Sequence, residues 1–198
     1  MRTSFLSLLL IYTTLFGANC FGQSIDEGLF VIDPKQSSIT FIGSQENKEF
    51  TGSFSQFYAL ISLLPEKNKI TAKVNTGSVN SNNKDRDTLL IGEDWFNIAV
   101  WPEATFNSAS VKQTAEGNYI ADGELTLRDI TQTIELRFSL MPSKISPYPR
   151  FIGSMNVRRL DFNVGKGDWM DTRWVANPVL VNIDLQLAPA PPMMSSPE

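Results

Sequence analysis

The residues of this chain that could carry out acid–base chemistry are carboxylates that lack a histidine partner. The 198-residue sequence contains no histidine and a single cysteine, Cys20. Triads of the Ser-His-Asp type and histidine-based zinc sites are therefore excluded. Asp87, Glu93, Asp94 and Asp161 are the candidates for a general acid or base, but their spacing matches no paired-carboxylate arrangement. We therefore predict a protein that is not an enzyme, with no catalytic residue and no metal site; an enzyme acting on a small apolar substrate is kept as an alternative.

The charges of the chain also limit its partners. Its 17 Lys and Arg residues are outnumbered by 21 Asp and Glu residues, giving a formal net charge of −4 without a basic cluster. Because binding to nucleic acid requires many phosphates to be neutralised, we predict no nucleic-acid partner. Arg86, between Asp85 and Asp87, could meet the polar head group of a ligand, but this charged run is better interpreted as the exposed start of a helix.

The first 22 residues have the pattern of a secretory signal peptide. Arg2 precedes an apolar run over residues 5–16, and small or turn-forming residues follow up to Gly22. The run is too short for a membrane-spanning helix, which needs about 20 apolar residues. We therefore predict an exported protein, periplasmic or secreted, that is cleaved near Gly22 and then has no cysteine for disulfides. Lipoprotein anchoring at Cys20 is the less favoured alternative, because Asn19 stands where a small residue is expected.

Most of the remaining chain alternates apolar and polar residues with a period of two. This pattern is typical of half-buried strands, and turn clusters such as 116–118 and 128–129 separate them at spacings that suit antiparallel hairpins. Residues 82–97 break the pattern and predict one or two short helices interrupted at Gly92. We predict an all-β domain over residues 23–188, with this short helical insert, and a disordered proline- and serine-rich tail over residues 189–198. The clearest strand patterns cover residues 39–41, 59–63, 70–74, 124–128, 133–140 and 179–187.

Several motifs in the same order resemble the YceI-like family of exported, lipocalin-like proteins that bind polyisoprenoids. They include 30–34 with its Asp33-Pro34 turn, followed by 37–41, then 94–97 with 101–106, and 123–131. The resemblance implies an antiparallel eight-stranded lipocalin-like β-barrel. Some positions depart from the family: Gln36 and Leu89 stand where many members carry histidine, so no metal or head-group role of those histidines transfers. Asn163 and Asp129 replace usual glycines, which leaves the local turn geometry open.

The resemblance implies a function as a carrier of a long isoprenoid, either a quinone or a polyprenyl lipid, or of a similar apolar chain. In such a barrel, alternation directs one face of each strand into the lumen. No cofactor is predicted besides this lipid. The late segment 159–169 resembles a branch found alone or fused to membrane b-type cytochromes, which implies a transient membrane or membrane-cytochrome partner; the oligomeric state is left open. The predicted ligand-binding residues are Ile39, Phe41, Phe54, Phe57, Ile61, Val74, Leu90, Trp95, Phe96, Phe106, Leu125, Leu127, Leu136 and Phe138.

A filled barrel would show the same alternation as a hollow one. By themselves these residues favour a plain hydrophobic core, and Trp95 and Phe96 favour a plug over a gate; the family resemblance is what favours a ligand. The main alternative is therefore a filled-barrel module of the cell envelope that binds another protein. It predicts a solid interior and a large exposed apolar patch.

Overall fold

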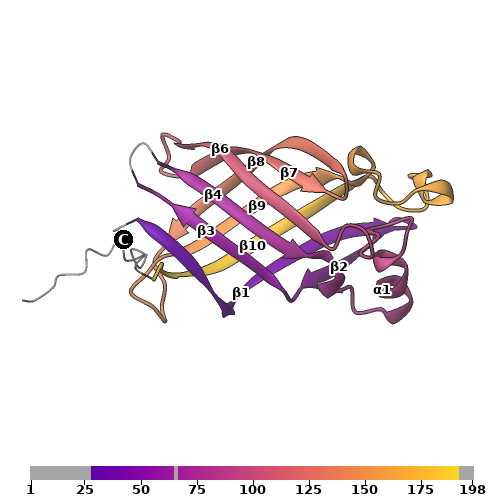
Figure 1. Cartoon of the computed structure of the whole chain (residues 1–198), viewed down its shortest axis with the longest axis horizontal. Helices are drawn as coiled ribbons and strands as arrows, with labels where there is room; N and C mark the ends of the chain where they lie inside the picture. Colours follow the sequence, from indigo (N-terminus) through magenta and orange to yellow (C-terminus); the bar gives the residue numbers. More distant parts are fainter. Residues whose placement is uncertain (1–27, 65–66, 192–198) are drawn as a thin grey trace, which may run out of the picture.

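A computed structural model describes residues 28–64 and 67–191 of the chain. The predicted signal peptide and most of the predicted tail lie outside these residues, as do Pro65 and Glu66 of the predicted turn over residues 65–68. Strands dominate the described part (Figure 1). They are β1 Leu29–Gln45, β2 Lys48–Phe54, β3 Phe57–Ser62, β4 Lys69–Asn75, β5 Val79–Asn80, β6 Glu103–Gln113, β7 Tyr119–Leu127, β8 Ile130–Met141, β9 Arg150–Arg158 and β10 Pro178–Pro189.

These strands close into an antiparallel barrel because the first long strand pairs with the last. Phe41 of β1 lies opposite Val181 of β10, and the pairing continues around the sheet to β9, β8, β7, β6, β4 and β3. β2 and β3 pair with different halves of β1, Ile39 with Phe54 and Phe30 with Ile61, so together they occupy one position in the wall. The predicted eight-stranded antiparallel barrel is confirmed; the two-residue β5 pairs only with β2.

The predicted turn at Asp33-Pro34 is instead a bulge inside the continuous strand β1. The pairing with β10 shifts between Asp33 and Ser38. The Ser37 hydroxyl donates to the Asp33 carbonyl at 2.6 Å and accepts the Gln186 N–H at 3.0 Å. These bonds replace the ladder bonds that the extra residues interrupt, so β1 bends without ending. Such a bend lets a long strand follow the curved wall of a closed barrel.

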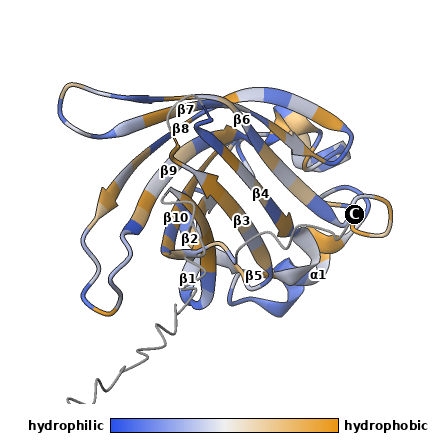
Figure 2. Cartoon of the chain, turned by 60° about the vertical axis from the view of Figure 1, so that its left-hand side comes forward, coloured by the Kyte–Doolittle hydropathy of each residue, from blue (hydrophilic) through white to orange (hydrophobic). Residues whose placement is uncertain are grey.

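Apolar side chains alternate along the strands and direct one face of the sheet inward. Figure 2 shows hydrophobic and hydrophilic segments alternating along the ribbons. On β3, for example, Ala59 and Ile61 are buried whereas Tyr58 is 48% exposed. The predicted strand patterns fall within β1, β3, β4, β7, β8 and β10 and are confirmed, except that residues 63 and 128 lie just beyond their strands. The core is therefore the barrel interior.

One end of the barrel is covered by two segments that are far apart in the sequence. The first is the insert between β4 and β6, which holds the 3₁₀ turn η1 Thr76–Ser78 and the helix α1 Lys84–Ile91. The second is the loop between β9 and β10, with the 3₁₀ turns η2 Arg159–Phe162 and η3 Gly167–Met170. Figure 1 shows both at the same end of the barrel, opposite the end where β1 begins and β10 ends. We call these segments the cap.

The helix in the cap follows the sequence prediction in part. Asn83 caps its start by accepting the Arg86 N–H at 3.0 Å, and the helix ends at Gly92 as expected. A second helix does not form, because residues 93–100 fold into turns in which backbone N–H groups donate to the carbonyls of Gly92 and Asn97. Asn163 has the left-handed φ of 55° that a glycine would favour, whereas at the β7–β8 turn it is Arg128, not Asp129, whose φ is positive, at 59°.

Candidate ligand-binding cavity

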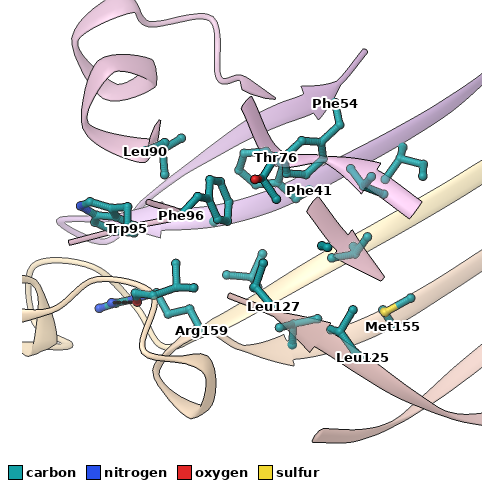
Figure 3. A pocket seen from close by; sticks show the side chains of 18 of the residues that line it. Phe41, Phe54, Thr76, Leu90, Trp95, Phe96, Leu125, Leu127, Met155 and Arg159 are labelled. Atoms are coloured by element: carbon teal, nitrogen blue, oxygen red, sulfur yellow. Dashed lines mark hydrogen bonds between the residues drawn. The ribbon is translucent and has the colours of Figure 1, made fainter. Parts of the chain in front are cut away.

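An apolar cavity of about 180 Å³ lies inside the barrel, beneath the cap. Almost every lining side chain is aliphatic or aromatic; the polar exceptions are Ser44, Thr76, Thr105 and Arg159. Figure 3 shows Phe41, Phe54 and Phe96 on one side of the space, facing Leu125, Leu127 and Met155 on the other. The Thr76 hydroxyl donates to the carbonyl of Pro102 at 3.0 Å, so it is already bonded to the wall. The cavity is thus suited to a guest that makes few hydrogen bonds.

Ten of the fourteen predicted ligand-binding residues line this cavity. Phe57, Ile61, Leu136 and Phe138 do not line it. Ile61, Leu136 and Phe138 are at most 3% exposed and pack into the part of the barrel where side chains fill the interior. Phe57 lies opposite Val74 and is only partly buried against the core. An inward-facing side chain does not necessarily line the cavity, because lining the cavity also depends on the height of the residue along the barrel axis. The ten are Ile39, Phe41, Phe54, Val74, Leu90, Trp95, Phe96, Phe106, Leu125 and Leu127.

Aromatic rings make up much of the wall formed by β1, β2 and the insert. The ring of Phe54 lies 5.5 Å from that of Phe41 and 6.0 Å from that of Phe96, between centroids. The ring of Phe41 lies directly over Gly52, where any Cβ would overlap it. A glycine at this position therefore lets the large ring lie against the sheet and leaves the space beside it open.

The cavity wall also includes residues from β9 and β10 that were not among the predicted ligand-binding residues. They are Met155 and Val157 of β9, and Val179, Val181 and Ile183 of β10. The β10 residues alternate within the predicted strand 179–187, so their common face was visible in the sequence. What the sequence lacked was the pairing of β10 with β1, which places this face opposite the helical insert.

A partition of four side chains separates the cavity from a second hollow on the outside of the cap. Phe50, Leu90, Trp95 and Val175 line both spaces. The outer hollow, of about 200 Å³, is also bordered by Gln45, Asn83, Asp85, Arg86, Leu89 and Trp169. The outer space is therefore polar and charged on one side, whereas the inner space is apolar.

Arg86 is held at this outer hollow by an aromatic ring. Its guanidinium carbon lies 3.8 Å above the centroid of the Phe50 ring, and its Nε donates to the Gln45 side chain at 3.4 Å. The neighbouring Asp87 accepts the N–H and hydroxyl of Ser81 at 2.7 and 2.6 Å. Asp87 therefore fixes the start of the helix, which agrees with the structural interpretation of this charged run.

The buried side chain of Arg159 holds the β9–β10 loop of the cap together. Its guanidinium donates to the carbonyls of Val164 at 2.8 Å, Trp169 at 2.5 Å, Val175 at 2.7 Å and Ala176 at 3.0 Å. Burial lowers the pKa of Arg159 from its ordinary value. The carbonyl dipoles stabilise the charge and also fix the path of the β9–β10 loop. A structural role for this arginine could not be predicted from the sequence, because nothing in the spacing of a lone arginine shows that it is buried.

Arg128 links the two segments of the cap. It is 4% exposed, and its Nη1 donates to the carbonyls of Trp95 at 2.6 Å and Asn163 at 2.7 Å. The backbone adds a second link, since the N–H groups of residues 165 and 166 donate to the carbonyl of Asp94 at 2.7 and 2.9 Å. The insert and the β9–β10 loop are therefore held as one cover.

The carboxylates considered for acid–base chemistry lie away from the cavity. Glu93, Asp94 and Asp161 are exposed, and Asp161 pairs with Arg158 at 3.3 Å. No acidic side chain is among the described residues that line the cavity. Within residues 28–64 and 67–191, no three His, Cys, Asp or Glu side chains come together as a metal site would require, and no helix is both long and apolar enough to span a bilayer.

A closed eight-stranded antiparallel barrel with an apolar cavity under one end is a lipocalin-like barrel protein. Within this class the chain belongs to the YceI-like family, since its residues 30–187 match the YceI-like domain. UPF0312 proteins of Yersinia enterocolitica and Yersinia pseudotuberculosis are 32% identical over 120 residues, which covers 57% of this chain and 62% of each relative. The match thus spans less than two thirds of these relatives' length.

Solved structures share the barrel. BcnA of Burkholderia cenocepacia superposes with a TM-score of 0.73 and 26% sequence identity, covering 79% of this chain and 99% of BcnA. A polyisoprenoid-binding domain from Saccharophagus degradans, implicated in plant cell wall breakdown, gives a TM-score of 0.61 with 16% identity, covering 82% of this chain and 98% of that domain. At that identity the second likeness shows the fold alone.

Proposed function

We propose that this protein binds the apolar chain of an isoprenoid lipid, such as a quinone or a polyprenyl compound, in the cavity beneath the cap and is not an enzyme. The observation that carries the proposal is the apolar cavity inside the barrel, a feature that a barrel filled throughout would lack. Family membership and the polyisoprenoid-binding domain with the same fold support the same class of ligand.

The free energy of such binding comes from removing hydrocarbon from water. At about 0.8 kcal/mol for each buried CH₂ group, a chain of roughly a dozen carbons gains on the order of 10 kcal/mol. Lost translational and rotational freedom subtracts a large share of this gain. A useful affinity therefore needs no charged or catalytic group in the cavity, which agrees with the apolar character of its walls.

The polar end of the ligand is assigned to the outer hollow. Gln45, Asn83 and Arg86 offer hydrogen-bond donors there, and Phe50 and Trp95 border both spaces. A lipid lying across this partition keeps its chain among apolar side chains and its head group among polar ones. No buried polar group of the ligand then loses its hydrogen bonds to water without replacement.

The cellular setting is proposed from the sequence. The apolar run over residues 5–16 behind Arg2 supports export to the periplasm or the exterior. A carrier of a membrane lipid must collect and deliver its ligand at a bilayer, so we assign it a transient contact with a membrane or with a membrane-embedded cytochrome. Localising the full-length protein by cell fractionation tests the export.

The direct test is to identify what the protein holds. The full-length protein is produced in a bacterium, purified without detergent, extracted with organic solvent and analysed by mass spectrometry. We expect a lipid with an apolar chain at close to one molecule per protein. Repeated absence of any lipid, together with unchanged tryptophan fluorescence on addition of quinones or prenols, would refute the proposal.

A matched pair of variants locates the binding site. Ala104 lines the cavity and Asn107, on the same strand β6, is exposed on the outer face. Ala104→Phe places a ring in the cavity, so we expect the amount of extracted lipid to fall at least tenfold. Asn107→Phe adds the same ring outside and is expected to leave the lipid content unchanged. Equal lipid content in both variants would mean that the ligand lies elsewhere.

A further inference from the structure

The cavity fills only the capped half of the barrel. On β4 the wall of the cavity includes Ala72, but Ile70, the next inward residue, is buried below it. On β10 the wall ends at Ile183, and Leu185 is 3% exposed in the packed interior. β8 contributes no residue to the cavity wall. The lumen is therefore hollow near the cap and closed further along the barrel axis.

The closure is a floor of aromatic and aliphatic side chains from different strands. The ring of Phe138 lies 4.3 Å from that of Phe151 and 5.0 Å from that of Tyr119, with interplanar angles of 16° and 12°. Ile61 of β3 and Leu136 of β8 are also inward-facing and at most 2% exposed. Interiors packed in this way do not shift to admit further atoms without cost. We call these five residues the floor.

The length of the cavity above the floor limits what can enter. Along β10 its wall runs from Val179 to Ile183, which at about 3.3 Å for each residue is on the order of 13 Å. An extended isoprene unit adds four carbons to the main chain, on the order of 5 Å at ordinary bond lengths. The cavity therefore has room for about two to three isoprene units. Beyond the partition at Trp95 and Leu90 lies the outer hollow, whose side chains Asn83, Asp85 and Arg86 favour a polar head group.

We propose that the floor makes this protein selective for a short chain of about two to three isoprene units, with Phe151 and Phe138 as the residues that set the length. This inference rests on the proposed function and makes it more specific. Each unit that enters the cavity adds contact with apolar wall, whereas a further unit must either displace the floor or remain outside. Affinity rises with chain length up to the floor and then stops rising.

The test is a series of prenols of increasing length added to the full chain. Geraniol, farnesol, geranylgeraniol and solanesol are titrated by tryptophan fluorescence, which reports through Trp95 at the cavity wall. We expect the dissociation constant to fall at least tenfold from geraniol to farnesol, and then to stay level or rise for the two longer prenols. A dissociation constant that keeps falling to solanesol would overturn the inference while supporting the proposed function. Absence of binding by every prenol would overturn both.

Two variants move the floor in opposite directions. Phe151→Ala removes a ring that is 1% exposed. We expect the optimum, meaning the shortest prenol that reaches the lowest dissociation constant, to move from farnesol to geranylgeraniol. Ala72→Leu narrows the cavity just above the floor, and we expect the optimum to move to geraniol. Phe162→Ala is the control for Phe151→Ala, because Phe162 is 0% exposed but does not line the cavity or belong to the floor. An unchanged optimum in folded Phe151→Ala and Ala72→Leu would contradict the inference; where Phe151→Ala does not fold, Ala72→Leu decides.

Discussion

The indole rings of Trp95 and Trp169 lie 5.6 Å apart between centroids, inclined at 57°, where the insert after β4 meets the loop after β9. Trp95 borders both the cavity and the outer hollow, whereas Trp169 borders only the outer hollow. The pair therefore closes the cap over the partition without filling the cavity itself. Any ligand that passes between the two spaces through this partition must disturb this contact.

Removing the outer ring should speed the release of ligand. In Trp169→Ala the cavity wall is intact, but the aromatic contact, worth about 0.5–1.5 kcal/mol, is lost. We expect the dissociation rate of farnesol to increase by a factor of about two to ten, with a smaller change in the dissociation constant. Stopped-flow fluorescence measures the rate. Trp174→Ala, which removes an indole that is 56% exposed and not on the cavity wall, is the control and should leave the rate unchanged.

The buried arginine of the cap should contribute strongly to stability. Arg159→Met leaves the carbonyls of Trp169 and Val175 without their donors, and we expect the free energy of unfolding to fall by about 3–5 kcal/mol. Denaturation in urea measures the change. Arg158→Met, at a neighbouring side chain that is 70% exposed and paired with Asp161, should cost less than about 1 kcal/mol. Similar losses in both variants would show that the carbonyl contacts contribute little.

The glycine beneath Phe41 should matter for both folding and binding. A methyl group in Gly52→Ala overlaps the ring, which must turn into the cavity. We expect a loss of about 1–3 kcal/mol in the free energy of unfolding and roughly tenfold weaker binding of farnesol. Urea denaturation and fluorescence titration measure the two effects. Ser53→Ala on the same strand lacks this overlap and serves as the control; unchanged binding in Gly52→Ala would place the ligand away from Phe41.

The pH dependence of stability should be confined to the acid range. With no histidine in the chain, we expect the free energy of unfolding to stay nearly constant between about pH 6 and 8. The side chain and N–H of Arg173 hold the pKa of Asp171 at about 2, below its usual 3.8. Because the pKa is lowered in the folded state, the stabilisation is complete above about pH 3.8 and is lost as the pH falls through about 2.

Asp171→Asn tests this assignment. The variant should unfold more readily than the wild type at pH 7, where the carboxylate is charged, and the difference should shrink as the pH is lowered toward 2. The effect is small because the pair lies at the protein surface. Thermal unfolding followed at both pH values measures the two differences. A difference of the same size at both would mean that the carboxylate charge is not its source.

Much of the barrel could be predicted from local patterns. Apolar residues at every second position determine strands with one buried face, and the predicted strand over residues 133–140 lies within β8. Asn83 and Gly92 mark the helix ends because the physics of helix capping is local. The bulge after Asp33 was not visible, because an Asp-Pro pair favours a turn and only the pairing with β10 keeps β1 continuous.

By itself the sequence determined an all-β chain, the inward face of its strands and the absence of histidine chemistry, because alternation and residue type are local properties. Only the tertiary structure decided where the interior is hollow. Phe138 and Leu125 both face inward, yet Phe138 is stacked between rings from β7 and β9, whereas Leu125 faces open space beneath the cap. Whether an inward side chain fills or borders a cavity depends on the sizes of its neighbours from distant strands, which only the closed barrel brings together.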